Sequence, residues 1–144
     1  PMKIVVDSKL KIPKQCSLMK EPSKLVLATT GIASKKEIEK FRQTGVNVII
    51  TKSIKGMVDL QDLMRQLGKH EITSVMIEGG SQLNSSAIKS GIVDKVLIFT
   101  APKIIGNGIG AIGNLGITKI GKAISLRNPV ARKIGKDMLV EGYI

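Results

Sequence analysis

The sequence predicts an α/β fold with a mostly parallel, mixed sheet flanked by helices and a C-terminal antiparallel strand pair. Short apolar runs typical of buried strands alternate with segments that have the period of amphipathic helices. This alternation is typical of βαβ units, whose strands are parallel and whose crossovers are right-handed. The last two apolar stretches are separated only by a glycine turn, and strands joined so tightly are antiparallel. Residues 1–144 are expected to form a single domain.

Five strands are expected before the final pair, at residues 3–7, 24–29, 46–51, 73–77 and 95–101. A first helix is expected from Ser34 to near Gly45, with Ser34 and Glu37 forming a capping box. Asp59 is expected to cap a second helix that Gly68 ends. The second helix carries an apolar stripe at i, i+3, i+4 and i+7, formed by Leu60, Leu63, Met64 and Leu67.

A long ordered loop, rich in glycine and isoleucine, is expected at residues 103–123. Its Gly106–Gly110 part resembles a nucleotide loop only superficially, because the full glycine spacing is absent and no periodic helix follows. The closing strands are expected at residues 123–132 and 137–144, joined near Gly135.

The most informative segment is the expected joint between the strand at 73–77 and a helix at about 81–90. Glu78 ends the strand, Gly79 and Gly80 remove side chains that would keep a ligand off the backbone, and Ser81 is expected to be the N-cap. The free N–H groups and positive dipole end of such a helix attract phosphate. Gly91 is a suitable C′ residue.

Two interpretations of this joint remain open. Diglycine turns are common connectors, so it can be an ordinary strand–turn–helix junction. A carboxylate at the carboxyl end of a central strand instead lies where open α/β sheets place ligands. Glu78 itself can be a ligand contact or a carboxylate that only stabilises the helix dipole.

The formal charge of +12, with 23 Lys and Arg against 11 acids, raises the possibility of nucleic-acid binding. The lysines are scattered, and Phe41, Phe99 and Tyr143 are the only aromatic residues, so no stacking platform is evident. A basic surface can instead attract an anionic small molecule, such as a phosphorylated substrate or cofactor, and a lysine-rich surface without functional meaning is the default interpretation.

The sequence gives little support to metal or thiol chemistry. Cys16 is the only cysteine and His70 the only histidine, so no zinc site or histidine-dependent triad is expected. A single cysteine is typical of a reducing cytoplasm. No apolar run reaches the roughly 20 residues of a membrane span, and no membrane association is expected.

Several segments together resemble the reductase domain of riboflavin biosynthesis, a dihydrofolate-reductase-like family. The first two read Ile-Val-Val-Asp-Ser-Lys-Leu-Lys-Ile-Pro at 4–13 and Val-Met-Ile-Glu-Gly-Gly-Ser-Gln-Leu at 75–83. The later ones read Gly-Ile-Val-Asp-Lys-Val at 91–96, Ala-Pro-Lys-Ile-Ile-Gly at 101–106 and Gly-Lys-Asp-Met-Leu-Val-Glu-Gly-Tyr at 135–143. They follow the family's order and span nearly the whole chain.

The resemblance implies NADPH-dependent reduction of the ribosyl group of 5-amino-6-(5-phosphoribosylamino)uracil to a ribityl group. It implies that Glu78 contacts this phosphorylated substrate. It also implies that the cofactor is bound by Ser8, Gly79, Gly80, Ser81, Gln82, Leu83, Asn84, Ser85 and Ser86. A fused or separate deaminase domain and a homodimer are the implied partners.

The chain also departs from the family pattern. Family members have another strand, an Ala-Met-Ser-Leu-Asp-Gly-like loop and an Asp-Pro-x-Leu-x-x-Arg segment before the part that corresponds to Ile4. The chain begins at Pro1, so we expect it to be N-terminally truncated relative to the family, with an unpaired sheet edge that a second copy or another chain would cover. Alternatives are the related reductase acting on the diaminopyrimidine before deamination and a non-catalytic nucleotide-binding or assembly domain. Lys52 and Lys55 are candidates for a 2′-phosphate contact.

Overall fold

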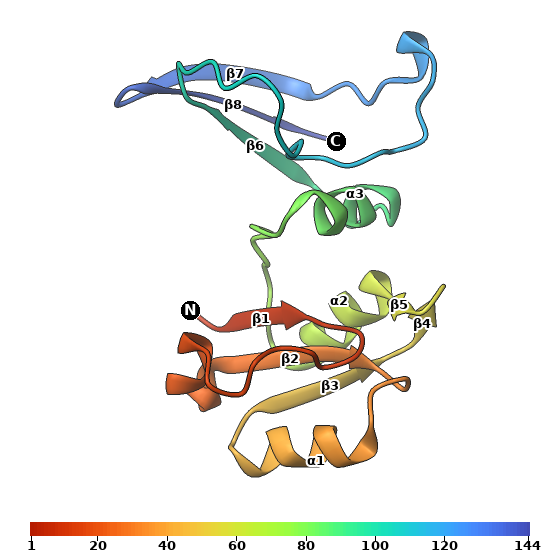
Figure 1. Cartoon of the computed structure of the whole chain (residues 1–144). Coiled ribbons are helices and arrows are strands. Elements are labelled where there is room, and N and C mark those ends of the chain that lie inside the picture. Colours follow the sequence, from red (N-terminus) through yellow and green to blue (C-terminus); the bar gives the residue numbers. More distant parts are fainter. The chain divides into compact units, whose positions relative to one another are not determined.

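The computed structural model describes all of residues 1–144. The chain divides into two compact units, residues 1–75 and residues 76–144, and each is described by itself (Figure 1). The single-domain organisation stays a prediction. No helix in either unit combines the length and apolar character that a membrane crossing requires.

The first unit contains a three-stranded parallel sheet in the order β1-β2-β3 and a small antiparallel pair of β4 with β5. The strands are β1 (Lys3–Val6), β2 (Leu25–Thr30), β3 (Asn47–Thr51), β4 (Ser53–Ile54) and β5 (Met57–Val58). The helices are α1 (Lys35–Gln43) and α2 (Leu60–Lys69), with short 3-10 turns at Ser17–Lys20 and Pro22–Lys24.

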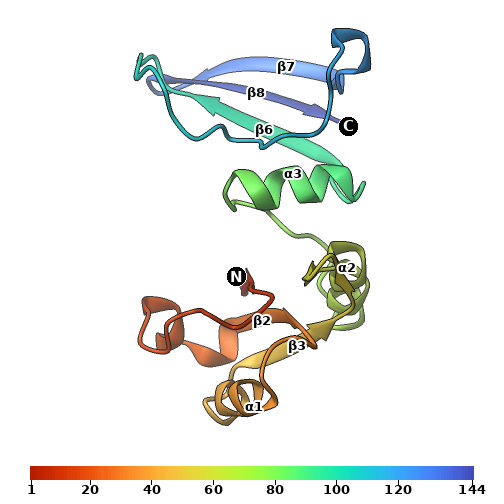
Figure 2. The same ribbon diagram turned by 45° about the vertical axis from the view of Figure 1, so that its right-hand side comes forward.

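The central strand β2 is buried at every position, as expected for a parallel strand covered on both faces. Leu25 and Leu27 belong to one core cluster with Ile38 and Phe41 of α1. Figures 1 and 2 show α1 and α2 on opposite sides of this sheet. The apolar stripe of α2 is confirmed, because its three leucines are all buried, at Leu60, Leu63 and Leu67.

The two helix starts in this unit differ. Asp59 caps α2 as predicted, and its carboxylate accepts a hydrogen bond of 3.1 Å from the N–H of Asp62. Ser34 occupies the N-cap of α1, but its side chain makes no capping bond. The predicted capping box is therefore wrong, because the Glu37 carboxylate binds Lys14 at 2.6 Å and Lys40 at 2.8 Å instead.

These two lysines set the charge state of Glu37. The hydrogen bond from Lys14, followed by that from Lys40, lowers the pKa of Glu37 from 4.5 to about 2. A lowered pKa stabilises the fold above pH 4.5, and this contribution disappears as the pH falls to about 2. Replacing Glu37 with Gln should lower the melting temperature slightly at neutral pH and not at all near pH 2. Melting curves of Glu39→Gln, on the same helix, provide the control; an equal pH dependence in both variants would contradict the assignment.

The second unit contains one helix and a three-stranded antiparallel sheet in the order β6-β8-β7. Its elements are α3 (Ser81–Lys89), β6 (Lys95–Thr100), β7 (Arg127–Ile134), β8 (Asp137–Tyr143) and a 3-10 turn at Ile120–Lys122. The carboxylate of Glu141 on β8 binds Lys95 of β6 at 3.0 Å and Arg132 of β7 at 3.6 Å, so it joins all three strands.

The C-terminal antiparallel pair is confirmed. Gly135 has a φ of +59° and, with Lys136, forms the turn between β7 and β8. The register shifts between Arg127 and Val130, where Pro129 lies, and proline is tolerated at such a bulge on an edge strand. The strand β7 begins at Arg127 rather than at residue 123, and the long loop at 103–123 contains only the single 3-10 turn.

The predicted strand at 73–77 is wrong. Residues 72–80 form an extended segment with no strand partner. Val75 is 37% and Met76 is 76% exposed, so this run is not part of a buried core. An apolar, β-branched run favours an extended backbone, but a strand also needs a neighbour for its N–H and C=O groups, and none of the observed strands pairs with it.

Candidate functional site

The predicted diglycine turn and helix start are present at α3, with the N-cap one residue from the expected position. Gly80, not Ser81, is the N-cap, with φ −65° and ψ 177°. The first helical bond runs from the N–H of Asn84 to the C=O of Gly80, at 3.1 Å. The N–H groups of Ser81 and Leu83 precede it and have no helical acceptor. This turn therefore presents backbone donors suited to an anion.

The start of α3 also differs electrostatically from those of α1 and α2. The first turn of α1 contains Glu37, and that of α2 contains Asp62 beside the capping Asp59. The first turn of α3 contains no acidic residue, and Gly80 supplies no capping side chain. The positive end of the α3 dipole is therefore not compensated by an acid of its own first turn, which favours an anionic ligand.

The two glycines before α3 have different surroundings. An added Cβ at Gly79 would stand 2.5 Å from Cδ2 of Leu83, so the leucine side chain would have to shift. An added Cβ at Gly80 would meet no atom within 4 Å. Internal packing therefore leaves the space in front of Gly80 open, and this is the side on which a ligand would approach the backbone.

Glu78 lies in the extended segment before these glycines and is exposed. The expectation that it ends a central strand is wrong, because that strand is not formed. Its position two residues before the N-cap nevertheless keeps it in the same corner of the second unit. Its role as a substrate contact stays a prediction.

Three predicted cofactor residues lie further along α3, and two of them use their side chains within the protein. The Ser85 hydroxyl is buried and donates to the C=O groups of Ser81 and Gln82, at 2.9 and 3.1 Å. The Asn84 amide donates to the C=O of Ala111 at 2.9 Å. Ser86 lies in the second turn, where its C=O accepts from Ser90.

Ser8 belongs to the first unit, where it follows β1. Its hydroxyl accepts a hydrogen bond from the N–H of Val58 at 3.1 Å, and its C=O accepts one from the Thr30 hydroxyl at 3.0 Å. Ser8 thus joins the carboxyl ends of β1 and β2 to β5. Asp7, which the sequence did not single out, holds the following turn by accepting from the N–H groups of Lys9 and Ile12.

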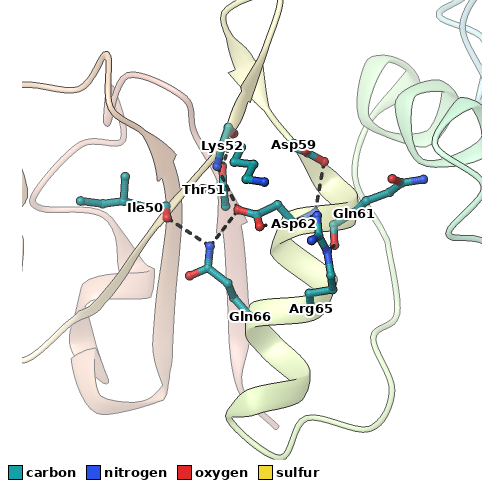
Figure 3. A network of polar contacts seen from close by, with 8 residues as sticks. All are labelled: Ile50, Thr51, Lys52, Asp59, Gln61, Asp62, Arg65 and Gln66. Carbon is teal, nitrogen blue, oxygen red and sulfur yellow. Dashed lines mark hydrogen bonds and ion pairs between the residues drawn. The ribbon is translucent and has the colours of Figure 1, made fainter.

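The candidates Lys52 and Lys55 are exposed and follow β3, and the backbone of Lys52 belongs to a polar network (Figure 3). Asp62 is its centre: its carboxylate accepts from the N–H of Lys52 and from the amide of Gln66, both at 2.9 Å. The Gln66 amide also donates to the C=O of Ile50 at 3.1 Å. The network fixes the start of α2 to the end of β3.

The charge state of Asp62 follows from these contacts. The hydrogen bond from the Lys52 backbone, followed by that from Gln66 and the charge of Arg65, holds the pKa of Asp62 below its ordinary value of 3.8. The side chain is only 13% exposed, so its hydrogen bonds are partly shielded from water. A structural role as an ionised acceptor is therefore assigned to Asp62.

The residues at the start of α3 suit a nucleotide diphosphate in their chemistry. They supply backbone donors, an open approach at Gly80 and an uncompensated dipole. They contain no histidine or cysteine. Their backbone donors can bind and orient an anion.

Residues 1–140 match the sequence model of a family described as the RibD C-terminal domain. The riboflavin biosynthesis protein RibD of Actinobacillus pleuropneumoniae is 41% identical over 145 residues, which cover 98% of this chain and 38% of that protein. The 2,5-diamino-6-ribosylamino-4(3H)-pyrimidinone 5′-phosphate reductase of Methanothermobacter thermautotrophicus is 29% identical, with 98% of this chain and 65% of that protein covered.

The fold also resembles a solved structure. RibD of Acinetobacter baumannii, form 2, has a TM-score of 0.81 and 17% identity, with 99% of this chain and 37% of that chain covered. At this identity the likeness concerns the fold. The chain spans less than two fifths of the RibD proteins that it matches.

Proposed function

The chain belongs to the RibD C-terminal domain family, and on this premise we propose that it is the reductase part of a riboflavin-biosynthesis enzyme. The proposed reaction is the NADPH-dependent reduction of the ribosyl group of 5-amino-6-(5-phosphoribosylamino)uracil to the ribitylamino product. The family match over residues 1–140 is the observation that carries the proposal.

The start of α3 is the part of the chain that we assign to the cofactor. Bound NADPH would supply the hydride that the reduction needs. The task of Gly80, Ser81 and Leu83 would be to hold its diphosphate through backbone N–H groups and the helix dipole. Most of the protein's contribution is then orientation, because the reactive hydride belongs to the cofactor.

The substrate is assigned to the neighbouring Glu78. In the reaction, C1′ of the ring-opened sugar gains a hydride with its electron pair, and the attached nitrogen of the imine gains a proton. The side-chain oxygens of Glu78 would accept hydrogen bonds from sugar hydroxyls or from a pyrimidine amino group. Its role would therefore be to place C1′ for the hydride, with no proton donation assigned to it.

A second substrate is favoured by one specific observation. Two of the matching relatives are named as reductases of the diamino-pyrimidinone phosphate, at 29% and 27% identity. We put the uracil substrate first because the 41% identity to a RibD protein exceeds both of these values. A fused or separate deaminase partner, a homodimer and a cytoplasmic location accompany this assignment as further parts of the proposal.

The experiment compares the two substrates at equal concentration with the purified chain and NADPH. The loss of the near-ultraviolet absorbance of NADPH reports the reduction. We expect a higher kcat/KM for the uracil substrate than for the diamino-pyrimidinone. A preference for the diamino-pyrimidinone would indicate that the reduction precedes the deamination step. NADPH that binds without turnover of either substrate would favour a non-catalytic nucleotide-binding domain.

A further inference from the structure

The glycine-rich loop after β6 returns to α3 and is held there by two hydrogen bonds (Figure 1). The side-chain amide of Asn84 donates to the C=O of Ala111 at 2.9 Å. The N–H of Gly113 donates to the C=O of Ser81 at 3.1 Å. Ser81 and Asn84 are three residues apart and share one face of the helix. We call these four residues the α3 clamp.

Packing makes the contact at Gly113 specific. A Cβ added there would stand 3.0 Å from the Ser85 hydroxyl, 3.2 Å from the Ser81 hydroxyl and 3.3 Å from the Ser81 C=O. The Ser85 hydroxyl is itself held by the C=O groups of Ser81 and Gln82, so it cannot move away without losing these bonds. A side chain at position 113 would therefore require the loop or the first turn of α3 to shift by a few tenths of an ångström.

The clamp acts on the residue that follows the N-cap. The C=O of Ser81 accepts from both the Gly113 N–H and the Ser85 hydroxyl, so this peptide group is restrained from the loop and from the helix. The next peptide group toward the N-terminus carries the Ser81 N–H, one of the donors assigned to the cofactor diphosphate. The two peptide groups meet at the Ser81 Cα, so once the carbonyl is fixed only the φ and ψ rotations of Ser81 can turn this donor.

We propose that Asn84 and Gly113 are positioning residues for the NADPH-phosphate corner, and that the Asn84 amide serves the loop rather than the ligand. This inference rests on the proposed function, because it names how the same corner is kept in place. It also assigns a task to the glycine-rich loop: residues 111–113 brace the first turn of α3. Preorganised donors bind an anion more tightly because less ordering is required on binding.

The test uses Asn84→Ala, Gly113→Ala and the double variant in the full chain. Each single variant should weaken NADPH binding about three- to tenfold, the size of one lost hydrogen bond. The double variant should lose no more NADPH affinity than the more strongly affected single variant, because both changes release the same attachment of the loop to α3. The KM for NADPH should rise with kcat unchanged at saturating NADPH, whereas a loss of folded protein would lower kcat alone.

Gly108→Ala is the matched control, because a Cβ there would meet no atom within 4 Å. It should leave NADPH affinity unchanged. Hydrogen–deuterium exchange of the Gly113 amide supplies a second readout that needs no ligand. Exchange should become faster in Asn84→Ala and stay slow in Gly108→Ala.

Two results would overturn the inference while leaving the proposed function intact. If Asn84→Ala weakens NADPH binding and Gly113→Ala does not, Asn84 is a direct ligand contact. If the wild-type chain binds NADPH and neither variant changes its affinity, the α3 clamp has no positioning role. A wild-type chain that does not bind NADPH is a different result, which refutes the cofactor assignment and the positioning role together.

Discussion

Replacing Gly80 with Asp should leave the chain folded and weaken its affinity for NADPH about a hundredfold or more. Space exists for the side chain, since a Cβ at Gly80 meets no atom within 4 Å. Aspartate is also a good N-cap residue, so α3 should be as stable as before or slightly more stable. The introduced carboxylate would compete for the N–H groups of the first turn and would repel the diphosphate. A fluorescence titration with NADPH and a melting curve measure the two effects.

Gly80→Asn is the matched control, because asparagine has nearly the same size and capping ability without the charge. We expect a smaller loss of NADPH affinity for Gly80→Asn than for Gly80→Asp. Equal losses would mean that bulk or capping, rather than charge, excludes the ligand. Wild-type affinity in Gly80→Asp would exclude the start of α3 as the diphosphate site.

Replacing Asp62 with Ala should destabilise the first unit by about 2 kcal/mol, because hydrogen bonds to an ionised acceptor are lost. The N–H of Lys52 and the amide of Gln66 would both lose the acceptor that now lies 2.9 Å away. The free energy of unfolding in urea measures this loss. Glu39→Ala, an exposed carboxylate on α1, is the control and should change the stability little.

The effect of Asp62→Ala should also depend on pH. The pKa of Asp62 is lowered in the folded chain, so its stabilisation is complete above 3.8 and is lost as the pH falls through the folded value. The difference in stability between wild type and Asp62→Ala should therefore be constant near neutral pH and shrink in acid. A difference that grows in acid would contradict the role of Asp62 as an ionised acceptor.

Features that depend on neighbouring residues could be predicted from the sequence. The Asp59 cap, the leucine stripe of α2 and the Gly135 turn each involve residues within one or two helical turns or a single hairpin. The helix start at α3 could be predicted for the same reason: a glycine pair directly before a helix is a local signal. The one-residue error at Ser81 arose because serine and glycine both favour the N-cap.

Features that depend on distant residues could not be predicted. Lys14 lies far from Glu37 in sequence, yet it takes the carboxylate that would have completed the capping box. The run at 73–77 has the composition of a strand, but strand formation depends on a partner that no local pattern specifies. Gly113 contacts Ser81 although β6 separates the two residues in the sequence. The glycine-rich sequence alone does not identify this contact.

The proposed reaction transfers a hydride from NADPH to C1′ of the substrate. The most direct measurement uses NADPH deuterated at the transferred position of the nicotinamide, the purified chain and 5-amino-6-(5-phosphoribosylamino)uracil, with mass spectrometry of the product. We expect a ribitylamino product that carries one deuterium at C1′. A reduced product without deuterium, or unchanged substrate in the presence of bound NADPH, would contradict it.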